Sequence, residues 1–416
     1  MRKFLLWLAS VASLLVPFGA GLSQSSPDGR TGALPRGSGD LEVRDFARLE
    51  RAKPVWEQVC QKTNSRPAIA GDQVILLERM DRGQERVRSF RLSTGEPTWE
   101  HRYPAPLPAF FDDEFGWGPH AAPAVAGQTV IVAGVTGIVW ALDLKTGRPR
   151  WRRDLWKEFA TATPLERGLA ASPVVEAGQV IVPVGGRGAG VVALDLETGR
   201  TRWTSGDFTA AYTTPVVGEL AGERQVVVLL HEVLAGLDPS TGRVLWETPF
   251  VTPNSVHVAS PLILDGQFVL AGSSGGTRLY EVVRQNGGWK ATEAWRTTRS
   301  TPQVGNFVRV QEQIIAPSSG GPGSLTTCLR WRDGSLVWKE RFGGRGSLVE
   351  LRDGLLTLND SGDLEVRRLA GTSVTPAIRL PGFAASPQWG APAFGKDVMV
   401  LQTGDRLQAW RLGSAR

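Results

Sequence analysis

Cysteine and histidine are scarce in this sequence, and their scarcity limits the chemistry open to it. The 416 residues include two cysteines, Cys60 and Cys328, and four histidines. The cysteines do not form a Cys-x-x-Cys motif and the histidines are scattered, so the sequence predicts no metal site. Whether the two cysteines pair depends on the fold, and two isolated thiols are the simpler interpretation.

An apolar run long enough to span a membrane comfortably is also missing. Residues 1–23 start with Met-Arg-Lys, continue with a short apolar stretch and end in small residues, which is typical of a cleaved secretory signal peptide. Because no cysteine follows this leader, we expect no lipid anchor. The sequence therefore predicts an exported, soluble protein; the alternative is a leader that stays uncleaved as a membrane anchor.

Positive charge is not concentrated on any one segment. The formal net charge is +6, carried mostly by arginine, without a cluster of lysine or arginine on one element. Nucleic-acid binding needs a basic patch or stripe, so the charge pattern argues against that function.

Helical periodicity is nearly absent from the chain. The exception is a short helix that we expect over residues 41–52, at the end of a flexible linker (24–52) that starts rich in serine, glycine and proline. Strand-like apolar runs dominate from residue 53 onward. We therefore expect three parts: the leader, the linker, and one β domain over residues 53–416.

A repeated unit organises that domain. Residues 193–203 read Ala-Leu-Asp-Leu-Glu-Thr-Gly-Arg-Thr-Arg-Trp, and similar units occupy 141–151 and 236–246, with weaker copies at 90–99 and 329–338. Each unit combines an apolar strand, a tight turn that ends in glycine, and a second strand that carries tryptophan. Repeats of about 40 to 50 residues indicate an array of supersecondary units.

The number of units follows from two landmarks. The first is the turn glycine, and the second is a small-residue step into proline before an apolar strand, at Pro67, Pro123, Pro173, Pro215, Pro261, Pro302 and Pro387. Two intervals, from Gly242 to Gly334 and from Pro302 to Pro387, are about twice as long as the others, so each is expected to contain one degenerate unit. The landmarks then give eight units of four strands. The strands of the third unit are expected at 172–176, 179–184, 190–196 and 201–204. The predicted fold class is all-β, an eight-bladed β-propeller of four-stranded antiparallel blades.

Closure of the ring involves the start of the domain. The chain ends on a third strand, Ala409-Trp-Arg-Leu412, without a tryptophan-bearing fourth strand. Lys53-Pro-Val-Trp-Glu57 is similar to Arg243-Val-Leu-Trp-Glu247, so we predict that residues 55–60 form the outer strand of the last blade and remove its exposed edge.

The repeated tryptophans and aspartates have structural explanations. A tryptophan on an outer strand can cover the junction with the neighbouring blade and bury a large apolar area. Asp143, Asp195 and Asp238 recur beside the turn at regular spacing, which is typical of side chains that cap turns and not of a unique catalytic base.

The unit Ala-x-Asp-x-x-Thr-Gly-x-x-x-Trp resembles the repeat of pyrroloquinoline-quinone (PQQ) propellers over residues 53–416. Exported bacterial PQQ-like repeat proteins are similar to this chain also in residues 115–123, 171–175 and 185–190. The repeat is shared by quinoprotein dehydrogenases and by the non-catalytic propeller of the outer-membrane β-barrel assembly machinery. The resemblance thus implies the fold and leaves the function open.

Dehydrogenases with this repeat hold PQQ with calcium and use an aspartate base and adjacent cysteines. This chain lacks a Cys-Cys pair and the large insertions of that family, so we predict no cofactor, no metal and no catalytic residue. The alternative is a PQQ-dependent alcohol dehydrogenase-like enzyme with an atypical site. In that case the polar residues expected near one mouth of the channel would bind the cofactor: His120, Asn254, His257, Arg299 and Asn306.

The favoured hypothesis is a non-catalytic, monomeric, exported propeller that acts as a protein-binding or scaffold module of the bacterial envelope, in the periplasm or outside the cell. Its partner is expected to be an envelope protein or peptide. The insert at residues 101–120 mixes aromatic and acidic residues and is the expected contact surface. A weaker third hypothesis, a carbohydrate-binding propeller, depends on exposed aromatics at one rim, where Trp117 and nearby phenylalanines qualify.

Overall fold

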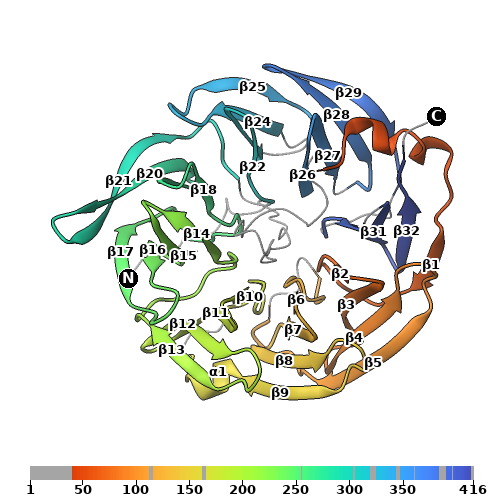
Figure 1. Ribbon diagram of the computed structural model, residues 1–416, viewed down its shortest axis with the longest axis horizontal. Coiled ribbons are helices and arrows are strands. Elements are labelled where there is room, and N and C mark those ends of the chain that lie inside the picture. Colours follow the sequence, from red (N-terminus) through yellow and green to blue (C-terminus); the bar gives the residue numbers. More distant parts are fainter. Residues whose placement is uncertain are drawn as a thin grey trace, which may run out of the picture.

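Eight four-stranded antiparallel sheets stand around a central axis in the computed structural model of the chain (Figure 1). The structure describes residues 40–111, 116–161, 165–253, 255–302, 305–318, 325–342, 347–359, 361–383, 390–395 and 397–413. In each blade the first strand lies nearest the central axis and the fourth lies at the outer edge of the ring. The predicted eight-bladed propeller is confirmed.

The first four blades follow the chain in order. Blade 1 contains β2 (Ala68–Ala70), β3 (Gln73–Arg79), β4 (Gln84–Arg91) and β5 (Pro97–Pro104). Blade 2 contains β6 (Ala124–Ala126), β7 (Thr129–Ala133), β8 (Ile138–Asp143) and β9 (Pro149–Asp154). Blade 3 contains β10 (Val174–Glu176), β11 (Gln179–Gly186), β12 (Ala189–Asp195) and β13 (Thr201–Ser205). Blade 4 contains β14 (Val216–Leu220), β15 (Glu223–Leu229), β16 (Val233–Leu237) and β17 (Val244–Pro249).

The remaining blades continue the ring. Blade 5 contains β18 (Leu262–Leu264), β19 (Phe268–Ser273), β20 (Gly276–Gln285) and β21 (Gly288–Thr297). Blade 6 contains β22 (Val308–Val310), β23 (Gln313–Ser318), β24 (Leu325–Arg330) and β25 (Leu336–Glu340). Blade 7 contains β26 (Ser347–Leu351), β27 (Gly354–Leu358), β28 (Leu364–Ala370) and β29 (Ser373–Leu380). Blade 8 contains β30 (Ala393–Phe394), β31 (Val398–Thr403), β32 (Arg406–Arg411) and β1 (Trp56–Val59).

The N-terminal strand closes the ring. β1 pairs antiparallel with β32, with Trp56 opposite Ala409. One backbone hydrogen bond extends the pairing at each end, from Val55 N–H to the Ala409 carbonyl and from Cys60 N–H to the Asp405 carbonyl, both 2.7 Å. The predicted closing strand over residues 55–60 is confirmed.

Helices are few and short in the described part of the chain. They are two 3-10 helices, η1 (Val43–Phe46) and η2 (Leu49–Arg51), and one α-helix, α1 (Leu155–Glu158), in the connection after β9. Val43 and Phe46 are buried with apolar residues of blades 7 and 8, and the Val43 N–H donates to the Asp353 carboxylate at 2.8 Å. Among the described residues, no helix is long and apolar enough to cross a membrane.

The hydrophobic core lies between neighbouring blades. Ile131 of blade 2, for example, is fully buried and belongs to one cluster with Val180 and Val182 of blade 3. This arrangement follows from the alternation of side chains along a strand, since both faces of every blade meet another blade. Cys60 and Cys328 are buried free thiols in blades 8 and 6, which confirms the interpretation that they are isolated.

Tryptophans join five of the junctions between blades. Each indole N–H donates to a backbone carbonyl of the next blade, at 2.7 to 3.0 Å: Trp56 to Leu92, Trp99 to Leu144, Trp151 to Leu196, Trp203 to Pro239 and Trp295 to Trp331. The ring lies on the turn glycine of that blade, so that a Cβ atom added to Gly199 would stand 2.6 Å from Trp151 Cδ2. The predicted inter-blade role of these tryptophans is confirmed.

Three junctions depart from this pattern, one of them because β29, the outer strand of blade 7, carries no tryptophan. The Trp246 indole donates within its own blade, to Gln225 Oε1 at 2.7 Å. In blade 5 the hairpin β20–β21 continues beyond the ring and closes only at Asn286-Gly287, so its turn glycine is not in contact with Trp246 (Figure 1). The Trp338 indole N–H has no acceptor among the described residues. The proline landmark also fails in blade 6, since β22 begins at Val308 and not directly after Pro302.

The two faces of the ring differ in their connections. On one, here called the turn face, tight turns join the first strand to the second and the third to the fourth. On the other, here called the loop face, the connections run from the fourth strand of one blade to the first strand of the next. His120, His257, Arg299 and Asn306, the predicted site residues within the described ranges, lie on connections of the loop face.

Candidate functional site

A chain of hydrogen bonds links five blades at the loop-face ends of their inner strands. Each of its residues stands two positions before the first residue of an inner strand; these are here called the rim positions. A backbone N–H at one rim position donates to the side chain at the next: Ala122 to Ser172 Oγ (2.9 Å), Ser172 to Thr214 Oγ1 (3.0 Å), Thr214 to Ser260 Oγ (3.1 Å) and Ser260 to Asn306 Oδ1 (3.1 Å).

The rim chain gives Asn306 a structural role. Its side chain is half-buried and accepts the N–H of the preceding blade, as the hydroxyl groups of blades 3 to 5 do. Buried N–H groups need acceptors, and these short side chains supply them where no β-ladder exists. The sequence contains the signal for the rim chain, because serine or threonine precedes Pro173, Pro215 and Pro261.

Both predicted site histidines are buried within the loop-face connections. His120 is 2% exposed, and burial, with a smaller effect from the charge of Arg167, lowers its pKa to about 4. His257 is fully buried, and burial lowers its pKa to about 4 as well. Its Nε2 lies 2.8 Å from the carbonyl oxygen of His231, and its ring meets Phe250 edge-on.

These environments determine what the histidines can do chemically. Both imidazoles are neutral at neutral pH, and a general base with a pKa of about 4 is too weak to work efficiently there. The hydrogen bond of His257 goes to a backbone carbonyl and not to another predicted site residue. The geometry therefore favours packing roles for both rings.

The other predicted residues are dispersed. Arg299 is exposed, and its backbone N–H donates to Thr297 Oγ1 at 3.2 Å. Asn254 lies outside the described residues. In the predicted insert, His101 belongs to β5, and Phe110 is 51% exposed whereas Phe111 is buried.

Trp117 in the same insert is half-buried on the loop face. The Lys62 ammonium group lies 5.0 Å from its ring centroid and the Arg82 guanidinium group lies 5.7 Å from it. Such cation–π contacts hold the insert against the start of blade 1. The carboxylates of the insert, residues 112–114, lie outside the described residues.

Calcium in a quinone site requires several oxygen ligands, including carboxylates. No group of three or more histidine, cysteine, aspartate or glutamate side chains converges within the described part of the chain. The repeated aspartates cap turns, as predicted: Asp195 Oδ1 accepts the backbone N–H and the hydroxyl of Thr198, both at 2.8 Å, on the turn face. The described residues thus do not fit a calcium-bound quinone.

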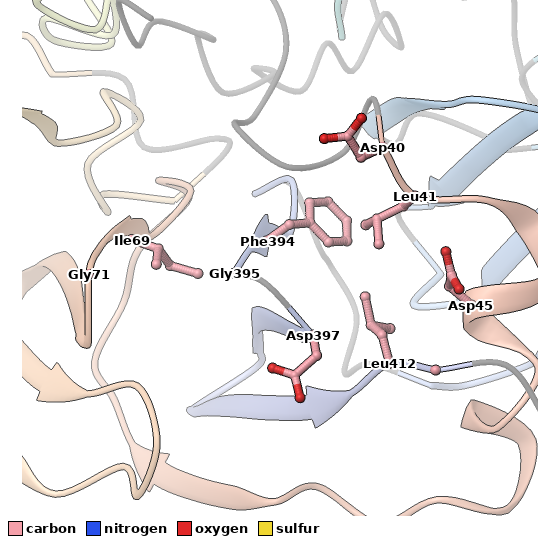
Figure 2. Close-up of a pocket in the computed structure, with 10 residues that line it drawn as sticks. Asp40, Leu41, Asp45, Ile69, Gly71, Phe394, Gly395, Asp397 and Leu412 are labelled. Carbon is pink, nitrogen blue, oxygen red and sulfur yellow. The ribbon is translucent and has the colours of Figure 1, made fainter. Parts of the chain in front are cut away.

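A pocket of about 590 Å³ opens on the turn face, between the N-terminal segment and blades 8 and 1 (Figure 2). Leu41, Ile69, Phe394 and Leu412 form its apolar walls, and three aspartates surround them. Each carboxylate already has a partner: Asp40 pairs with Arg352, Asp397 pairs with Arg411, and Asp45 accepts the Glu42 N–H. The pocket therefore belongs to the packing of the N-terminal segment, and none of the predicted site residues lines it.

Comparisons with known proteins agree with the propeller fold. A family model described as outer membrane protein assembly factor BamB matches residues 83–340. The BamB of Yersinia pestis is 25% identical over 262 residues, which are 58% of this chain and 64% of that protein. The quinoprotein alcohol dehydrogenase PedH of Pseudomonas putida is 24% identical over 241 residues, which are 54% of this chain and 37% of that enzyme.

The chain thus spans less than two-thirds of the length of either relative. The crystal structure of BamB from Moraxella catarrhalis superposes with a TM-score of 0.59 at 16% identity, covering 86% of this chain and 99% of that one. At this level of identity the superposition shows a shared fold. The PQQ-like propeller that the repeat predicts is confirmed.

Proposed function

The chain belongs to the family described as outer membrane protein assembly factor BamB, and on this premise we propose that it is a non-catalytic propeller of the bacterial envelope that binds another envelope protein. The match of the family model to residues 83–340, which run from blade 1 through blade 6, carries the proposal. An assembly factor, as the relative from Yersinia pestis is named, acts through contacts with other proteins. The chain acts as a monomer in the periplasm or outside the cell, after removal of residues 1–23.

The loop face is the proposed contact surface. Phe110 is 51% exposed and Val251 is 54% exposed, and both lie on loop-face connections. Exposed aromatic and aliphatic side chains with arginine nearby suit the core of a protein interface. Arg278 stands beside Val251 and donates to its carbonyl at 2.8 Å.

Site-specific photo-cross-linking tests this proposal. A photoreactive amino acid replaces Phe110 or Val251 on the loop face, and Glu197 on the turn face in the control; each variant is expressed in the source bacterium. We expect the loop-face variants to form one common adduct with a component of outer-membrane protein assembly, and the Glu197 variant to lack it. Phe110→Ser should then weaken binding of the purified partner. The same adduct from both faces, or none from the loop face, would contradict the proposal.

A PQQ-dependent dehydrogenase is the second candidate, favoured by the similarity to PedH. Its test is a titration of the purified mature protein with PQQ and calcium, followed by dye reduction with simple alcohols. Saturable binding with turnover would replace the binding-module proposal by the enzyme. If PQQ binds without turnover, or does not bind, the proposal of a non-catalytic binding module is retained.

A further inference from the structure

The rim chain is interrupted at blades 8, 1 and 2. The residues at the rim positions of these blades are Ala391, Arg66 and Ala122. An alanine side chain cannot accept a hydrogen bond, and a guanidinium group only donates. Two backbone N–H groups consequently lose the acceptor that the rim chain provides elsewhere. In the pattern of the other blades, residue 122 would supply the acceptor for the Arg66 N–H, and residue 66 would supply it for the Ala391 N–H. Neither has another acceptor among the described residues.

The Arg66 side chain adds a positive charge at the same place. It is 2% exposed, and its Nε has no hydrogen-bond partner within the described ranges. Burial alone lowers its pKa to about 10, without a carboxylate to oppose the shift. A buried cation without a counter-charge costs several kcal/mol of folding free energy, and an arginine with this pKa stays charged at neutral pH.

Another buried arginine of this chain shows the usual solution. Arg79 is 1% exposed, and its two terminal nitrogens donate to the Ala105 carbonyl at 2.9 and 2.7 Å. One of them also lies 3.9 Å from the Glu85 carboxylate. The contrast with Arg66 indicates a missing negative partner and not a general tolerance of buried charge.

Close backbone contacts hold the segment around Arg66 in place. A Cβ atom added to Gly390 would stand 3.1 Å from the Ser65 carbonyl oxygen, and one added to Gly118 would stand 2.8 Å from Thr63 Cα. The Asn64 N–H donates to the Pro119 carbonyl at 2.9 Å. The segment that leads into blade 1 is thus held between the corresponding segments of blades 8 and 2. Its hydrogen-bond donors are therefore ordered without a bound ligand.

We propose that this interruption is a binding site for a small oxyanion at the loop-face end of the inner strands of blades 8 and 1, with the Arg66 guanidinium group and the Ala391 N–H as donors. A guanidinium group forms paired, charge-assisted hydrogen bonds to phosphate, sulfate or carboxylate oxygens. Ordered backbone N–H groups complete such sites in other proteins. The site is independent of any protein partner.

Calorimetric titration of the full mature protein tests the site, with inorganic phosphate, sulfate and acetate as separate ligands and chloride at equal ionic strength as the blank. We expect saturable one-to-one binding of at least one of them, and its identity distinguishes a phosphate or sulfate site from a carboxylate site. Arg66→Met should reduce the affinity about tenfold or more. Without the anion, this variant should melt at a higher temperature than the wild type, because it removes the uncompensated buried charge.

Two further variants separate the site from general effects of charge or folding. Ala122→Ser places an acceptor on the blade 2 side of Arg66, opposite to Ala391, and should leave the anion affinity unchanged while the protein stays folded. Arg202→Met removes an exposed arginine on the turn face, paired with Asp195, and should leave the affinity unchanged. Absence of saturable binding of all three anions at millimolar concentration overturns the proposal. So does an Arg66→Met affinity equal to that of the wild type.

Discussion

The contribution of one docked tryptophan can be isolated by comparing two matched substitutions. Trp151 and Trp338 both lie half-buried on outer strands, but only the Trp151 indole N–H has an acceptor, the Leu196 carbonyl at 2.8 Å. Trp→Phe removes the same atoms at both sites, so the shared loss of apolar contact cancels in the comparison. What remains is the difference between a buried indole N–H with an acceptor and one without, about 1–3 kcal/mol of the free energy of unfolding. We therefore expect Trp151→Phe to destabilise the protein by about 1–3 kcal/mol more than Trp338→Phe.

Urea unfolding followed by circular dichroism measures this difference as a shift of the midpoint at constant slope. Equal losses at the two positions, or a larger loss at Trp338, would refute the assignment of the hydrogen bond. A double-mutant cycle tests the steric part. Gly199→Ala should cost more than the ~1 kcal/mol of its positive φ, because the new Cβ meets the Trp151 ring. In a Trp151→Ala background only the backbone cost should remain; an unchanged cost would contradict the docking geometry.

Three further predictions address the rim chain, the thiols and the pH dependence. Ser172→Ala leaves the Ala122 N–H buried without an acceptor and should cost about 1–3 kcal/mol in urea unfolding, whereas Ser172→Thr should cost less because it keeps the hydroxyl. Cys60 and Cys328 are buried, and burial raises both pKa values to about 12, so a thiol reagent should label them only after denaturation; rapid labelling of the native protein would contradict this. Burial lowers the His257 pKa from 6.5 to about 4, so between these pH values the imidazole is protonated in the unfolded chain and neutral in the folded one. The free energy of unfolding should therefore fall as the pH drops from 6.5 to 4. His257→Asn should make the free energy of unfolding less dependent on pH in this range.

The repeat allowed most of the fold to be predicted from sequence. The tryptophan–glycine contact between blades can be recognised from local sequence. Within each repeat, the turn glycine stands four residues before the tryptophan of the outer strand. Because the repeats have the same geometry, the tryptophan of one blade meets the turn glycine of the next. The closing strand was predictable for the same reason, because Trp56 stands in a copy of the motif at the other end of the domain. The landmark at Pro302 misplaced the start of blade 6, because Phe307 stands directly before β22, where other blades have proline.

The site was much less accessible to sequence reasoning. His120 and His257 were expected near the channel mouth, but their burial, which lowers both pKa values, depends on contacts between different connections. Arg66 was not singled out, because an arginine before Pro67 is an ordinary surface pattern. Its significance comes from its rim position next to two alanines in other blades, and only the closed ring brings those three residues together.

The docked tryptophans bear on how such a ring can grow during evolution. A blade of the common kind carries a tryptophan for the blade after it and a turn glycine for the tryptophan of the blade before it. A tandem duplication of the gene segment for such a blade therefore produces a copy that can make the tryptophan–glycine contact with both neighbouring blades, without a second mutation elsewhere. Blade 5, whose third and fourth strands extend to a turn beyond the ring, does not accept the preceding tryptophan. The altered hairpin of blade 5 is thus accompanied by an altered contact in blade 4, where Trp246 donates to Gln225 of its own blade. A change in one repeat therefore affects the side chain of the repeat before it.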